Sequence, residues 1–325
     1  MRLRRSDLSK PGITRRRSGK GFSYRDPDGR TVRDAGTLHR IRALVIPPAW
    51  RDVWISPDPR GHIQATGFDA AGRKQYRYHD HWRTARDEEK FDHALAVAER
   101  LPEVRDRLRA DLTTGRGLTR ERVLAAVVLL LDMGTFRVGG DAYAARAEDP
   151  SYGLSTLLPD HVRTRNGCVI LEYPAKSGVP RADPVDDGEV CAVLRSLKRR
   201  RAGEARLFAY WDGRQRRWQE IHADTINDYL REISGEQMTA KDFRTWHGTV
   251  KAAAELAGVG PQPTRAKRKR AVAHAMKEVA DLLGNTPAVA RAAYVDPRVL
   301  DHYERGEVVE EGRESEVRDL LRDDT

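Results

Sequence analysis

The sequence predicts an α+β protein in which a small antiparallel β domain precedes a larger, mainly helical domain that carries a small sheet. The chain has 325 residues, which is more than one compact domain usually holds. Short alternating stretches separated by Gly- and Pro-rich turns dominate its beginning. Later, apolar residues recur at helical spacing. We therefore expect two domains of different class.

The β-rich part extends from Gly12 to about Arg83, with strand-like stretches at residues 21–24 and 75–78. The pattern changes after Thr84, so we expect a domain boundary between Arg83 and Glu89. This divides the chain into an N-terminal β-rich domain at residues 1–85 and a C-terminal, mainly helical domain at residues 86–325.

The second domain should begin with an amphipathic helix over residues 88–112. A second helix is expected after Thr119, which is placed to cap it, with Leu118 packing against Val123. The apolar run LAAVVLLLDM that follows predicts a helix buried at the centre of the domain.

Asn166-Gly167 separates two strand-like stretches, which is a strong hairpin signal and predicts the small sheet. Helices are expected again near Glu189, over residues 223–233, and after Thr239, which should cap through its own hydroxyl. The last long helix should run over residues 266–283 and end at Gly284. Residues 311–325 are highly charged and predict a peripheral tail.

The charge balance favours a polyanionic partner. Lys and Arg number 59 against 49 Asp and Glu, giving a formal charge of +10 and a pI near 9.7. Nucleic acid is favoured over an anionic membrane, although an Arg-rich composition inherited from a GC-rich genome is an alternative. The chain has no run of about 18 apolar residues, so we expect no membrane span. Its two cysteines, Cys168 and Cys191, form no disulfide framework, which suits a reducing cytosol.

Common catalytic signatures are absent from the sequence, namely GxxxxGK[ST], GxSxG, HExxH and a paired-carboxylate motif. His79 and His81 would share one face of a strand without a third ligand, so a metal site there is not favoured. What remains is a set of cations and one tyrosine at structural transitions: Arg137, Lys176, Arg244 and Tyr294. Together they suit phosphodiester cleavage, which needs a nucleophile, cations for the non-bridging oxygens and an acid for the leaving oxygen.

Segments along nearly the whole chain resemble the poxvirus-type branch of the type IB DNA topoisomerases, as found in some bacteria. GFSYRDPDGR, LHRIRALVIPPAW and GRKQYRYH resemble the amino-terminal β domain of that family. The resemblance implies that Gln75, Tyr76 and Tyr78 contact DNA. A glutamine side chain is suited to adenine in the major groove and tyrosine hydroxyls are suited to phosphate.

Three motifs of the second domain resemble the catalytic segments of the family. GTFRVGG implies that Arg137 contacts the scissile phosphate, and YPAKSG implies that Lys176 protonates the leaving 5′ oxygen. KDFRTWHGT implies that Arg244 is the second phosphate-binding arginine. Related tyrosine recombinases usually carry histidine three residues before this arginine, whereas this chain has Lys241, as the topoisomerases do, and we expect Lys241 to contact DNA.

LGNTPAVARAAYVDP resembles the segment of the nucleophile, which implies that Tyr294 attacks the phosphate. Thr286 and Pro287 predict the start of a short helix that ends near Tyr294. Many family members have histidine at the position of Asn285. The resemblance implies that Asn285 donates a hydrogen bond to a non-bridging oxygen, which a neutral amide can do without acting as a cation.

The resemblance thus implies relaxation of double-stranded DNA through a 3′-phosphotyrosyl intermediate, by a monomer whose two domains close around the duplex. It implies no cofactor, no ATP and no obligatory metal, and a bacterial protein of the cytoplasm associated with the nucleoid. We also expect the basic run at residues 264–270 to lie near DNA. Two alternatives stay open at this point, a site-specific tyrosine recombinase and a DNA-binding protein that has lost activity.

Overall fold

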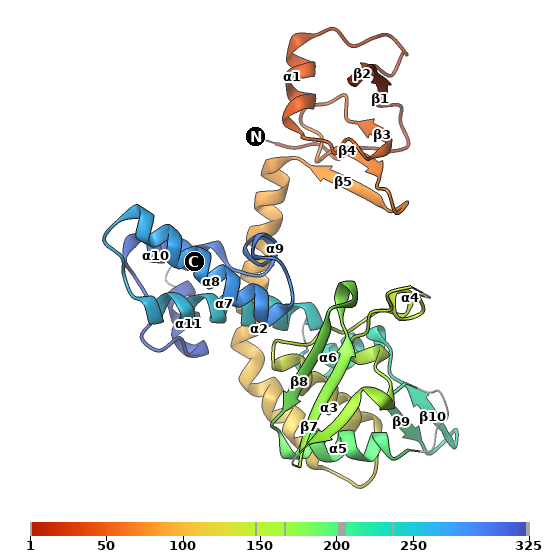
Figure 1. The fold of residues 1–325 in the computed structure, drawn as a ribbon, viewed down its shortest axis with the longest axis vertical. Helices are drawn as coiled ribbons and strands as arrows, with labels where there is room; N and C mark the ends of the chain where they lie inside the picture. The colour runs from red at the N-terminus through yellow and green to blue at the C-terminus, as the bar shows by residue number, and fades with distance from the viewer. Residues whose placement is uncertain (1, 147, 166, 201–205, 236, 323–325) are drawn as a thin grey trace. The chain divides into compact units, whose positions relative to one another are not determined.

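The computed structural model describes residues 2–146, 148–165, 167–200, 206–235 and 237–322, and it divides into two compact units (Figure 1). The units are Met1–Lys90 and Phe91–Thr325. The division falls inside helix α2 (Asp80–Thr113), which begins at Asp80 rather than at Glu88 as expected. The first turns of α2 are charged and largely exposed, with the ion pair Arg83–Asp80, so apolar periodicity could not reveal them.

The first unit is built on a five-stranded antiparallel sheet in the order β2-β1-β3-β4-β5. Its core consists of buried aliphatic side chains from the sheet and from α1, namely Ile13, Ile41, Val53, Ile55 and Ala65. The two strands expected from the sequence are confirmed as β2 and β5. The elements are β1 (Ile13–Ser18), β2 (Gly21–Arg25), α1 (Ala35–Ala43), β3 (Arg51–Ile55), β4 (Ile63–Phe68) and β5 (Lys74–Tyr78).

The core of the second unit surrounds helix α3 (Arg120–Asp132), in which every residue from Val123 to Leu131 is buried. Thr119 caps this helix by accepting a hydrogen bond from the backbone N–H of Arg122, as predicted. Helices α5 (Gly188–Lys198), α6 (Ala223–Ser234) and α7 (Ala240–Val259) pack against α3. The expectation of a buried central helix is therefore confirmed.

A three-stranded antiparallel sheet interrupts the helices, with β7 (Cys168–Pro174) between β6 (Val162–Arg165) and β8 (Pro180–Val185). Asn166 of the expected hairpin lies outside the described residues, and Gly167 has a φ of 81°, which favours glycine. A two-stranded sheet of β9 (Ala209–Asp212) and β10 (Arg217–Glu220) was not predicted. Short segments complete this region, α4 (Asp141–Ala144) and the 3₁₀ turns Leu154–Thr156, Pro159–His161 and Lys176–Gly178.

The chain ends in four helices: α8 (Arg265–Leu283), α9 (Pro287–Ala293), α10 (Pro297–Arg305) and α11 (Glu314–Arg322). The prediction of a peripheral tail at residues 311–325 was wrong for residues 311–322, and residues 323–325 lie outside the described part of the chain. Val317 and Leu321 of α11 are buried in the main core, because they lie one helical turn apart on the inner face of an otherwise charged helix. Among the described residues, no helix combines the length and apolar character needed to cross a membrane.

Candidate active site

Arg244 lies in the first turns of α7 and is only 4% exposed. Thr239 is the N-cap residue of this helix, as predicted, and Asp242 completes a capping box by accepting hydrogen bonds from the Thr239 backbone N–H and hydroxyl at 2.8 and 2.9 Å. Arg244 Nη2 donates to the Leu283 carbonyl at 2.7 Å. Its Nε and Nη1 atoms are buried and have no hydrogen-bond partner within the described chain. The Leu283 carbonyl thus satisfies only one nitrogen of this buried guanidinium.

Arg137 lies in the loop that follows α3 and meets the same helix end. Its Nη2 atom donates to the carbonyls of Leu283 and Gly284 at 2.9 and 2.8 Å. The last carbonyls of a helix carry partial negative charge, so the C-terminus of α8 can hold two guanidiniums near each other despite their repulsion. Gly284 ends α8 with a φ of 59°, the left-handed conformation that is typical of a helix C-terminus. The end of α8 thus sets the position of both arginines.

Asn285 follows Gly284, and its Oδ1 accepts a hydrogen bond from Arg137 Nη2 at 2.9 Å. A guanidinium has only donors, so the amide must turn its oxygen toward Arg137. Its Nδ2 atom is then left buried and without a partner within the described residues. Asn285 thus presents an unused N–H donor beside the two arginines.

Tyr294 lies at the C-terminal end of α9, the short helix that Thr286 and Pro287 were predicted to start. Thr286 accepts a hydrogen bond from the Val289 backbone N–H, as a capping residue should. The Tyr294 carbonyl rests on α7, since a Cβ atom on Gly248 would lie only 2.6 Å from it. Glycine is therefore required at this close approach between α7 and the tyrosine.

The phenol of Tyr294 lies beside the buried guanidinium, with Arg244 Cζ 5.1 Å from the centre of its ring. Burial acts to raise the pKa of Tyr294, but Arg244 and then Arg137 outweigh it and leave the pKa below its ordinary value. Burial and the charge of Arg137 lower the pKa of Arg244 to about 10, so it remains a cation at neutral pH. The site thus favours an anion at the tyrosine oxygen.

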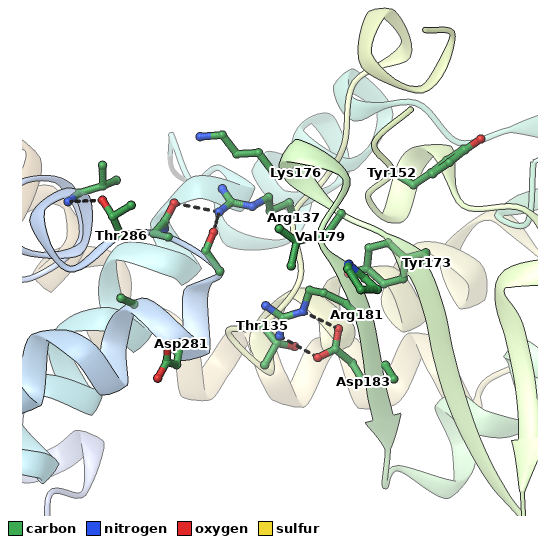
Figure 2. A pocket seen from close by; sticks show the side chains of 17 residues that line it. Thr135, Arg137, Tyr152, Tyr173, Lys176, Val179, Arg181, Asp183, Asp281 and Thr286 are labelled. Atoms are coloured by element: carbon green, nitrogen blue, oxygen red, sulfur yellow. Dashed lines mark hydrogen bonds and ion pairs between the residues drawn. The ribbon is translucent and has the colours of Figure 1, made fainter. Parts of the chain in front are cut away.

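Lys176 occupies the turn between β7 and β8, where Gly178 has a φ of 69°. Its side chain is exposed and lines a cavity of about 660 Å³ together with Arg137 and Asn285. Figure 2 shows the side chains of Lys176 and Arg137 extending in the same direction, toward the segment that contains Thr286. The lysine can therefore reach the mouth of this cavity.

Arg181 of β8 also lines the cavity, and sequence reasoning missed it. Its guanidinium donates to both carboxylate oxygens of Asp183 at 3.0 and 2.8 Å, and this pairing raises the pKa of Arg181. Arg181 and Asp183 are two residues apart in β8, so their side chains lie on the same face of the strand. This spacing is the signal by which the sequence could have indicated the pair. Because Asp183 offsets its charge, Arg181 adds less to the field of the cavity than Arg137 does.

Gln75, Tyr76 and Tyr78 lie on β5 of the first unit. The two tyrosines are 39% and 45% exposed, and their rings stack with centroids 6.0 Å apart. The Gln75 amide nitrogen donates a hydrogen bond to Asp69 at 2.9 Å. The side-chain oxygen of Gln75 takes no part in this bond. The tyrosines are thus a surface feature of the strand and are not buried in the core of the unit.

The second unit brings Arg137, Arg244, Asn285 and Tyr294 together at the end of α8, and it places Lys176 on the adjoining cavity. Lys241 is exposed in the first turn of α7. Within the described residues, no group of three His, Cys, Asp or Glu side chains is placed to hold a metal ion.

Cationic donors, an unused amide and a tyrosine of lowered pKa form an arrangement suited to the class of proteins that transfer a phosphodiester to tyrosine. Residues 79–315 match the family described as eukaryotic DNA topoisomerase I, catalytic core, and residues 21–69 match bacterial DNA topoisomerase IB, N-terminal domain. DNA topoisomerase 1B of Acanthamoeba polyphaga mimivirus is 31% identical over 305 residues, which cover 90% of this chain and 88% of that protein. The chain belongs to the type IB DNA topoisomerase family. The predicted fold class and family are thereby confirmed.

Proposed function

We propose that this type IB topoisomerase relaxes supercoiled duplex DNA with Tyr294 as its nucleophile. The observation that carries the proposal is the meeting of Arg137, Arg244 and Asn285 at the end of α8, with Tyr294 against Arg244. Unused N–H donors on Arg244 and Asn285 match the needs of a phosphate with two non-bridging oxygens.

In the proposed reaction the Tyr294 phenol loses its proton to solvent, its oxygen attacks a backbone phosphorus and forms a 3′-phosphotyrosyl bond, and the bond to the 5′ oxygen breaks. Arg137, Arg244 and Asn285 stabilise the charge that develops on the non-bridging oxygens. Lys176 gives a proton to the departing 5′ oxygen. The free strand rotates, and the 5′ hydroxyl then attacks the phosphotyrosyl bond and restores the DNA.

This reaction should need neither ATP nor a metal ion, because the phosphotyrosyl bond conserves the energy of the phosphodiester and supercoiling drives rotation. The test is relaxation of a negatively supercoiled plasmid in chelator without nucleotide. We expect the parent protein to relax the plasmid and the Tyr294→Phe protein to be inactive. A matched control is Tyr210→Phe, since Tyr210 lies on β9, which contributes none of the proposed catalytic residues. Relaxation by Tyr294→Phe would reject the assignment.

The covalent step can be separated from DNA binding by denaturing the protein on end-labelled duplex. A 3′-phosphotyrosyl enzyme stays attached to the label after denaturation, whereas a protein that only binds DNA releases it. We expect an adduct with the parent and none with Tyr294→Phe. Equal adducts from both would place the nucleophile elsewhere, and no adduct from either would favour a DNA-binding protein.

Gln75, Tyr76, Tyr78 and Lys241 are proposed to contact the duplex, and so is the exposed start of α8 at residues 264–270. We also propose that the chain acts as a monomer in the cytoplasm, on DNA of the nucleoid. Mass measurement on a duplex of defined length tests the first point, because a recombinase-like synapse would contain four protein copies. Imaging of a tagged chain with a DNA stain tests the second.

A further inference from the structure

A partly buried ionic cluster joins four helices, with one residue each from α2, α3, α7 and α11. Arg105 of α2 donates to both oxygens of Asp132 at 2.7 and 2.9 Å, and to both oxygens of Glu314 at 2.9 and 2.8 Å. His247 of α7 lies with Nε2 3.0 Å from Asp132 Oδ1. Because an ionised carboxylate can only accept, this ring nitrogen carries the proton.

The cluster is placed between the segments that hold the two phosphate-binding arginines. Asp132 ends α3, and the loop to Arg137 begins directly after it. His247 follows Arg244 on α7 by three residues, which is about one helical turn. The bond between Asp132 and His247 therefore ties the loop of one arginine to the helix of the other.

A steric contact accompanies this hydrogen bond. Gly134 has a φ of 77°, and a Cβ atom built on it would lie 2.9 Å from the Cβ atom of His247. The loop that leads to Arg137 thus packs directly against His247. Only glycine at position 134 allows both the positive φ and this close contact. The spacing between the loop and α7 is fixed by contact as well as by the hydrogen bond.

Helix α11 completes the cluster through Glu314. Burial acts to raise the pKa of Glu314, but its hydrogen bonds with Arg105 outweigh this and hold the pKa below its ordinary value. Burial also acts to raise the pKa of Asp132. The hydrogen bond with His247, and after it the hydrogen bonds with Arg105, outweigh burial and hold this pKa below its ordinary value. Both carboxylates are therefore charged partners of Arg105 at neutral pH, and removing either one would leave donors of this guanidinium without an acceptor.

We propose that His247 is a positioning residue that sets the distance between Arg137 and Arg244 through Asp132 and Gly134. The inference rests on the proposed function, in which both arginines contact one phosphate. A misplacement of about 1 Å in a catalytic geometry can cost on the order of 100-fold in rate. His247 is mostly buried, with a side chain 15% exposed, and it acts through the arginines without contacting DNA itself.

The test compares His247→Ala, His247→Gln and the parent in single-turnover cleavage of a suicide duplex, with DNA affinity and melting temperature measured in parallel. Gln can place an amide N–H near the position of the imidazole Nε2 and should restore the bond to Asp132. We expect His247→Ala to cleave roughly 10- to 100-fold more slowly with DNA affinity within about twofold of the parent. His247→Gln should recover most of the rate.

Two control variants separate positioning from loss of folding. His274→Ala removes a histidine that is 53% exposed on α8, and it should leave the rate unchanged. Tyr303→Phe removes a hydrogen bond to the Gly260 carbonyl at 3.0 Å, and it should lower the melting temperature without slowing cleavage. If Tyr303→Phe slows cleavage as much as His247→Ala at the same loss of melting temperature, the effect is one of stability and the proposal fails.

A double-mutant comparison distinguishes failure of this inference from failure of the proposed function. If His247 acts by placing Arg137, then His247→Ala added to Arg137→Ala should cost much less than it costs in the parent. Full additivity, or a parental rate for His247→Ala, overturns the positioning role while Arg137 and Tyr294 keep theirs. A parental rate for both Arg137→Ala and Tyr294→Phe overturns the proposed function itself.

Discussion

Arg137 and Asn285 are joined by a hydrogen bond of 2.9 Å that directs the amide oxygen of Asn285 toward the guanidinium. The bond leaves the amide nitrogen as a donor, which explains how a neutral side chain can stand where relatives often have histidine.

We therefore predict that Asn285→His retains the cleavage rate within about tenfold, because imidazole can also accept from Arg137 and donate to phosphate. Asn285→Asp should lose on the order of 100-fold or more, since a carboxylate can only accept and its charge repels phosphate. Single-turnover cleavage measures both. If the Asn285→Asp protein cleaves DNA as fast as the parent, the side chain at this position donates no hydrogen bond to the phosphate.

Arg137→Ala and Arg244→Ala should each slow cleavage on the order of 100-fold or more, the usual effect of removing one donor to a developing oxyanion. Arg181→Ala is the matched comparison, because Arg181 lines the same cavity but is paired with Asp183. It should slow cleavage less than either of the other two. Cleavage within a few-fold of the parent for Arg137→Ala or Arg244→Ala would remove that arginine from the site.

Lys176→Ala should be slow on an ordinary duplex and recover on a duplex whose scissile 5′ bridging oxygen is replaced by sulfur. A thiolate leaves without a proton, so the acid is no longer needed. Arg137→Ala should gain much less from the same substitution, because its proposed role is charge stabilisation. A Lys176→Ala protein that is equally slow on both substrates would contradict the role of general acid.

The rate of single-turnover cleavage should rise with pH and level off below pH 10, because the pKa of Tyr294 is lower than its ordinary value of 10.0. Arg244→Gln removes the nearest cation, so the cleavage rate of this variant should reach its plateau at a higher pH than that of the parent. Arg244→Lys keeps a cation, so its rate should reach the plateau near the pH of the parent. Above the pKa of Arg244, about 10, the parent should lose activity. A plateau at the same pH in Arg244→Gln would refute the link between the two residues.

DNA affinity should fall steeply as salt rises from about 50 to 200 mM, because phosphate contacts release counterions. Phe replacements of Tyr76 and Tyr78 keep the stacked rings and remove only the hydroxyls, so they should weaken binding at all salt concentrations. Filter binding on one duplex measures both effects. Affinity that is independent of salt would contradict an interface dominated by phosphate.

The sequence could predict those parts of the site that local chemistry determines. Thr286 and Pro287 indicated the start of α9, and Gly284 indicated the end of α8, because caps and left-handed glycines act over a few residues. Tyr294 was placed through its position in this segment. The family resemblance supplied the roles, which no single residue could have indicated.

The tertiary partners of these residues could not be predicted. The carbonyl of Leu283 joins Arg137 and Arg244 across 146 and 39 residues of chain, and no sequence pattern encodes such a contact. The burial of α11 was missed for a similar reason, since Glu314 finds Arg105 only in the folded chain. Charge alone indicated a solvated tail, whereas pairing allows the charges to be buried.

The unused donors of Arg244 have a consequence for folding as well as for chemistry. A buried N–H without an acceptor destabilises the folded state by about 1–3 kcal/mol, so the Nε and Nη1 donors of Arg244 lower the stability of the fold that positions them. If a DNA phosphate accepts from these donors, as we propose, DNA binding should raise the melting temperature of the protein.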